Sequence, residues 1–117
     1  MPTIRDVVQA LSKRRGVDSV LVMGRDGLPI DSVCRDGVDS DAVAALVPAL
    51  VNWCNKVGSA GSRGSMQTSV MEYEGGFTII SVITSDAILA LFVQPHTNVG
   101  SLLFELRRYQ AAIAGLL

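Results

Sequence analysis

The stretch of residues 77–93 constrains the fold more than any other part of the sequence. Its last seven residues, Ala87–Val93, include no polar side chain. Such a run is typical of a strand that is covered on both faces, because a strand with one solvent-exposed face alternates polar and apolar residues. Thr84, Ser85 and Asp86 precede it and supply turn-forming side chains. We therefore predict that residues 77–83 and Ala87–Val93 are two paired strands. The second should lie in the middle of a sheet, with helices above and below it.

The composition favours one domain with an aliphatic core. At 117 residues the chain is long enough for such a core, and we assign residues 1–117 to a single domain. Hydrophobic residues make up 49% of the chain but aromatic residues only 5%. Ten basic and eleven acidic side chains give a net charge of −1, without the basic excess that nucleic acids or anionic membranes select.

Three sequence features indicate the cellular compartment of the protein. The N-terminus has no apolar signal core, and no apolar run approaches the length that spans a membrane. Two cysteines are too few for a secreted disulfide scaffold. We therefore expect a cytoplasmic protein with no nucleic-acid partner and no direct insertion into a membrane.

The remaining segments predict three helices and three further strands. Ile4, Val7, Val8 and Leu11 form one apolar helical stripe. Pro29 lacks the N–H group that an inner strand needs, so we place its strand at an edge of the sheet. The predicted order is helix, two strands, helix, three strands and helix, at residues 3–15, 17–23, 28–33, 41–58, 66–73, 77–83, 87–93 and 98–115.

The long helix at residues 41–58 carries more apolar surface than one sheet needs. At ~100° per residue its large apolar side chains cover an arc of ~160°. The surplus predicts a second contact, most simply with the same helix of another copy. The pattern runs unbroken through Pro48, so we expect a kink there rather than the end of the helix. The apolar positions repeat at steps of four and three, with three more beside them: Val43, Val47, Leu50, Cys54 and Val57, then Leu46, Val51 and Trp53.

The residue types offer little support for catalysis. His96 is the only histidine, which rules out a histidine-based metal cluster, and we interpret it as a loop residue. Cys54 lies on the apolar stripe and acts as a small hydrophobe, whereas nothing in the sequence marks Cys34 as activated. The glycine-rich segment before residue 66 has no lysine before a serine or threonine, unlike a phosphate-binding loop. We therefore expect no enzyme activity, no cofactor and no metal. Trp53 is either a core residue or an anchor for a partner.

Three segments resemble the roadblock family of dynein light chains and bacterial GTPase regulators. They are residues 16–30, which match the first hairpin, Glu74-Gly75-Gly76 before the central strands, and residues 98–103 at the start of the last helix. The resemblance implies a profilin-like, three-layer α/β/α fold. Its five-stranded antiparallel sheet would have the order second, first, fifth, fourth, third strand. It also implies a homodimer in which the third strands pair and the long helices pack together.

The resemblance implies a homodimeric regulatory module that binds a small Ras-like GTPase and modulates its GTPase cycle. The alternative is a non-catalytic scaffold or adaptor subunit of a motor- or signalling-associated complex with further subunits. A small-ligand sensor is a third option, because the fold resembles ligand-binding sheet modules. We predict that the dimer interface comprises Val43, Leu46, Val47, Leu50, Trp53, Cys54, Val57, Met66, Thr68 and Val70. We predict that the partner-binding residues are Asn52, Asn55, Lys56 and Arg63.

Overall fold

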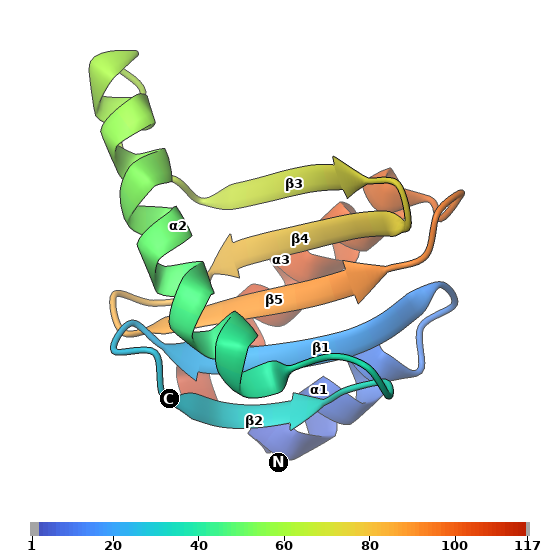
Figure 1. The fold of residues 1–117 in the computed structure, drawn as a ribbon. Coiled ribbons are helices and arrows are strands. Elements are labelled where there is room, and N and C mark those ends of the chain that lie inside the picture. The colour runs from blue at the N-terminus through green and yellow to red at the C-terminus, as the bar shows by residue number, and fades with distance from the viewer. Residues whose placement is uncertain (1–2, 117) are drawn as a thin grey trace.

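The computed structural model describes residues 3–116, and in them three helices and five strands follow the predicted order (Figure 1). All four strand pairs are antiparallel, and the strands lie in the order β2-β1-β5-β4-β3. The predicted fold class and sheet order are thus confirmed. The elements are α1 (Ile4–Ser12), β1 (Val17–Gly24), β2 (Pro29–Val33), α2 (Ser40–Ala60), β3 (Thr68–Tyr73), β4 (Gly76–Val82), β5 (Ala87–Val93) and α3 (Val99–Leu116).

The first helix begins directly after Thr3, which caps it. The backbone N–H of Asp6 donates to Thr3 Oγ1 at 3.1 Å, and the N–H of Thr3 donates to Asp6 Oδ2 at 2.9 Å. This reciprocal capping box satisfies two donors that a helix start leaves free. The hydrogen bond from the Thr3 backbone, followed by the one with its side chain, lowers the pKa of the Asp6 carboxyl.

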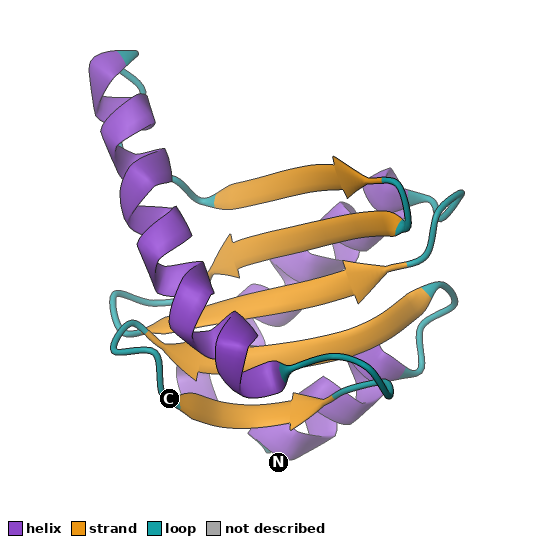
Figure 2. Cartoon of the chain, in the orientation of Figure 1, coloured by secondary structure: helices purple, strands orange, loops and turns teal. Residues whose placement is uncertain are grey.

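The sheet separates two apolar cores, as the purple helices on either side of the orange strands show (Figure 2). Helices α1 and α3 cover one face and α2 crosses the other. Within β5, Leu89 and Leu91 pack toward α1 and α3, whereas Ile88 and Ala90 pack toward α2. The uniformly apolar sequence of β5 therefore reflects a central strand with both faces buried, as predicted.

The two faces are covered unequally. The backbone of α2 lies closest to β1 and β2, and its buried side chains also reach Ile80 of β4 and Ile88 and Ala90 of β5. In the view of Figure 1 its C-terminal turns project beyond β3. The helix continues through Pro48 to Ala60, so the proline does not end it. The part of the sheet that α2 does not cover is left open, and the candidate site lies there.

No helix within residues 3–116 combines the length and the apolar character needed to cross a membrane.

Candidate protein–protein interface

Helix α2 has two apolar faces. Ala44, Val47 and Val51 point into the sheet and are buried. Leu46 and Trp53 lie roughly on the opposite side of the helix and are 68% and 65% exposed. Large apolar side chains this exposed on one helix are typical of a surface that contacts another protein. The arc predicted from the sequence therefore divides into an inner face toward the sheet and an outer face toward solvent.

A groove of about 400 Å³ lies beside the outer face, between α2 and the uncovered part of the sheet. Its floor comes from β3, β4 and β5, and its wall comes from α2. The lining is mostly apolar, with the hydroxyl groups of Thr78 and Tyr73 as its polar features. The lining residues are Val43, Leu46, Val47, Leu50, Trp53, Met71, Tyr73, Thr78, Ile80 and Phe92.

The free edge of β3 borders the groove. The carbonyl of Gln67 accepts a hydrogen bond from the N–H of Val82 on β4. Backbone groups that bond to β4 alternate along an antiparallel strand, so Ser69 and Met71 also face β4. Thr68, Val70 and Glu72 therefore direct their backbone N–H and C=O groups away from β4. No backbone group of these three residues is bonded across another edge within residues 3–116. Such an edge can template the addition of another strand.

Only part of the predicted dimer-interface set lies on this surface. Val43, Leu46, Leu50 and Trp53 line the groove, and Val57 is exposed one turn further along α2. Val47 also lines the groove, although its side chain is only 6% exposed and packs mainly in the protomer's own core.

The remaining members of the predicted interface lie elsewhere. Cys54 is half-buried on α2, and Met66 precedes β3 instead of belonging to it. The side chain of Val70 shares a face with Ile79, which lies in the core beneath α1 and α3. Thr68 points the same way. These two residues thus present their backbones at the free edge, but their side chains lie across the sheet from α2.

The four predicted partner-binding residues have different surroundings. Asn52 is exposed, and the exposed Lys56 places its Nζ 4.6 Å from the centroid of the Trp53 ring. Arg63 is exposed in the loop after α2, where it approaches neighbouring carbonyl groups. Asn55 instead turns inward, and its Oδ1 accepts the N–H of Met66 at 2.8 Å. Asn55 thus has a structural contact within the chain, and its role toward a partner stays a prediction.

Sequence reasoning missed the floor of the groove, which includes Met71, Tyr73, Thr78 and Phe92. A signal for Phe92 was present, because it alternates in phase with Ile88 and Ala90 on the α2 side of β5. The sequence did not reveal that α2 leaves this end of the strand uncovered.

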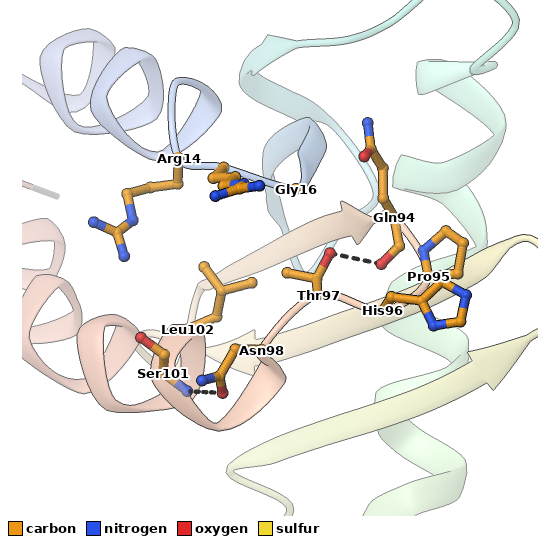
Figure 3. A pocket seen from close by; sticks show the side chains of 10 residues that line it. Arg14, Gly16, Gln94, Pro95, His96, Thr97, Asn98, Ser101 and Leu102 are labelled. Carbon is orange, nitrogen blue, oxygen red and sulfur yellow. Dashed lines mark hydrogen bonds between the residues drawn. The ribbon is translucent and has the colours of Figure 1, made fainter.

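A second, polar hollow lies between the end of α1 and the start of α3 (Figure 3). Several of its polar side chains already have partners within the chain. Thr97 Oγ1 donates to the carbonyl of Gln94 at 2.7 Å, and Asn98 Oδ1 accepts the N–H of Ser101 at 3.0 Å. His96 is exposed beside them, in the loop where it was predicted. Within residues 3–116 no group of three histidine, cysteine or acidic side chains is placed to hold a metal ion. The apolar groove remains the stronger candidate site.

The chain is similar to known proteins in sequence and in fold. The model of the Roadblock/LC7 domain family matches residues 3–92. The uncharacterized protein MJ0310 of Methanocaldococcus jannaschii is 26% identical over 102 residues, which cover 87% of this chain and 89% of that protein.

Two solved structures share the fold. MglB of Myxococcus xanthus has a TM-score of 0.87 at 14% identity, covering 94% of this chain and 90% of that chain. A Roadblock/LC7 domain from Streptomyces avermitilis has a TM-score of 0.85 at 20% identity, covering 96% and 95%. The family model spans most of the sequence, and the chain therefore belongs to the Roadblock/LC7 domain family.

Proposed function

We propose that two copies of this chain form a cytoplasmic homodimer that binds a small Ras-like GTPase and modulates its GTPase cycle. The dimer would have no catalytic or nucleotide-binding site of its own. The observation that carries the proposal is the exposed apolar face of α2 beside the free edge of β3. The partner class rests on the roadblock family, which includes bacterial regulators of such GTPases.

The free edge favours one register for the pairing of two β3 strands. The outward-facing residues are Thr68, Val70 and Glu72, and an antiparallel, two-fold symmetric pair must align outward residues with each other. If the symmetry axis passes through Val70, all three residues of both copies form hydrogen bonds. A shift of two residues leaves Glu72 or Thr68 unpaired. The register centred on Val70 is therefore the one with the most hydrogen bonds.

The outer face of α2 would be covered by the same association. Leu46, Leu50 and Trp53 flank the groove, and the floor includes Phe92 and Met71. The second copy would place the same apolar side chains of its own α2 against this groove. Burial of each large apolar side chain contributes roughly 1.5–3 kcal/mol. The strand pairing would set the orientation and the helix packing would supply most of the affinity.

The GTPase would contact the surface that this pairing leaves exposed. Asn52 and Lys56 lie on α2 outside the groove lining, and Arg63 follows in the next loop. Two copies would present these residues twice, so that a single GTPase could contact both helices. Asn55 also belongs to the predicted partner-binding set: its amide oxygen accepts the N–H of Met66, and its amide NH2 group would donate to the partner.

Two measurements test the proposal. Light scattering after size-exclusion chromatography should give the mass of a dimer. The purified protein should then capture a purified Ras-like GTPase from the same organism, in one nucleotide state more strongly than the other, and should change its turnover. No complex in either state, together with unchanged turnover, would contradict the GTPase role. Equal binding in both states without a change in turnover would support a scaffold instead.

A matched pair of variants locates the contact. The double variant Asn52→Asp, Lys56→Glu should remain dimeric but bind the GTPase more weakly. Lys13→Glu changes an exposed cation just after α1, far from the proposed surface in the fold, and should bind normally. Equal loss of binding in both proteins would place the contact elsewhere.

A further inference from the structure

The two edges of the sheet differ in what their backbones offer to another strand. On β2, both backbone groups of Ser32 are already engaged by side chains. Its N–H donates to Asp31 Oδ1 at 2.8 Å, and its carbonyl accepts from Arg5 Nη1 at 3.1 Å. The same Arg5 nitrogen forms an ion pair with Asp31 at 2.8 Å. We call Arg5 and Asp31 the edge clasp.

The rest of β2 is poorly suited to pairing. Pro29 has no N–H group to donate. The register passes from Asp31 directly to Pro29, so Ile30 has no opposite residue on β1 and lies in a bulge. Among the five residues of β2, Ser32 is therefore the one that faces outward within a regular part of the ladder. The edge clasp occupies the position on which any pairing through β2 would depend.

At the other edge, β3 carries the charged side chain of Glu72, but in the described part of the chain its outward-facing backbone groups have no side-chain partner. Thr68, Val70 and Glu72 direct three successive sets of N–H and C=O groups outward, and no side chain within residues 3–116 bonds to them. The strand also contains no proline and no bulge in its pairing with β4. Bulges, prolines and charged side chains at an edge are known devices against unwanted strand addition. Here all three occur on β2.

We infer that the edge clasp closes the β2 edge, so that this sheet adds a strand only through β3. An association through one edge related by a two-fold axis ends with two copies, whereas two open edges would let the sheet grow from copy to copy. The closed edge would thus make the proposed dimer the final assembly of the sheet. The inference deepens the proposed self-association, and it rests on that proposal for the role of β3.

Removing the clasp is a practical experiment, because the side chains of Arg5 and Asp31 are 54% and 21% exposed, and an ion pair that reaches the surface contributes little to stability. The double variant Arg5→Ala, Asp31→Ala frees both backbone groups of Ser32, and we call it the open-edge variant. Light scattering should then show species larger than the wild type, with a mass that rises with concentration. The control is the double variant Arg14→Ala, Glu105→Ala. It removes an ion pair of 2.7 Å that joins Arg14, in the loop between α1 and β1, to Glu105 of α3, away from either edge of the sheet. Its mass should equal that of the wild type.

A third substitution distinguishes strand pairing from general aggregation. Ile30→Lys, added to the open-edge variant, places a charge at the bulge of β2 and should restore the wild-type mass. Larger species that persist with Ile30→Lys would overturn the inference, as would a folded open-edge variant whose mass never exceeds that of the wild type.

The reference in each case is the mass of the wild-type protein itself. A monomeric wild type would reject the proposed dimer, yet the clasp would still predict that the open-edge variant is larger. A dimeric wild type with an unchanged open-edge variant would reject the clasp alone. The two failures are therefore distinguishable.

Discussion

The side-chain oxygen of Asn55 accepts the backbone N–H of Met66 at 2.8 Å, and this bond joins the later turns of α2 to the segment that leads into β3. The bond holds the helix and the free strand edge in a fixed relation, although the loop between them is long and rich in glycine. Both parts of the candidate interface depend on that relation.

Asn55→Ala should lower the free energy of unfolding by about 1–3 kcal/mol, since it leaves the N–H of Met66 without its acceptor in a half-buried position. Chemical denaturation measures the loss. Asn52→Ala, at an exposed position on the same helix, is the control and should change stability by less than about 0.5 kcal/mol. Equal effects in the two variants would show that the bond contributes nothing.

Leu46→Asp should separate the proposed dimer without unfolding the chain. Leu46 is exposed in the single chain but would be buried between copies, where an unpaired carboxylate is strongly unfavourable. We expect the dissociation constant to rise by more than about 100-fold, measured by sedimentation of a dilution series. Ala45→Asp, at an exposed position outside the groove lining, should leave the dimer intact.

Leu50→Asp differs from Leu46→Asp, because Leu50 is half-buried and packs against the α2-side core. That variant should lose folded stability as well as association.

Val70→Pro tests the strand pairing. The N–H of Val70 points away from β4, so its loss spares the internal ladder but removes two hydrogen bonds from a symmetric dimer centred there. At about 0.5–1.5 kcal/mol for each of the two bonds, the dimer should weaken by about 5- to 150-fold. Met71→Pro removes an N–H that points toward β4, and it should instead destabilise the fold itself. A dimer of wild-type affinity in Val70→Pro would rule out pairing through this edge.

Gly76→Ala should destabilise the β3–β4 turn. Gly76 has φ of 140°, and a Cβ at this position would overlap the carbonyl oxygen of Val93. A residue forced into such a conformation costs of order 1–3 kcal/mol before the overlap is counted. The melting temperature should fall measurably. The neighbouring Gly75→Ala meets no atom within 4 Å and should melt near the wild-type temperature.

The pH dependence of α1 should follow the Asp6 carboxyl. Because its pKa is lowered from 3.8 in the folded state, the stabilisation is present above that value and is lost as the pH falls through the lower, folded-state pKa. The wild type should therefore be more stable than Asp6→Ala at neutral pH, and the difference should shrink in acid. Denaturation series at several pH values measure it. A difference that stayed constant into strong acid would contradict the assignment.

The sequence predicted the sheet well, because its signals depend on single chemical facts. The wholly apolar Ala87–Val93 could only be a strand with two buried faces, and Pro29 could only lie where no N–H was needed. The surplus apolar arc of the long helix likewise predicted two faces. These inferences required no knowledge of how the elements were placed in space.

The sequence could not show how single residues of the predicted interface are placed, since periodicity shows which residues share a face but not what that face contacts. Val47 belonged to the inner arc of α2 and not to the outer one. Thr68 and Val70 alternate correctly, yet their side chains lie opposite to α2. Asn55 was polar and was interpreted as solvent-facing, whereas a backbone N–H eleven residues later engages it.

The projection of α2 past the sheet has a consequence for how the molecule behaves when dilute. Its last turns have little beneath them, and helical turns without packing on one face open more easily than those on a core. If a second chain supplies the missing packing, the protection of the amides near Trp53 and Val57 from hydrogen exchange should rise with protein concentration. The exchange rates of these amides would then report the fraction of chains that are associated.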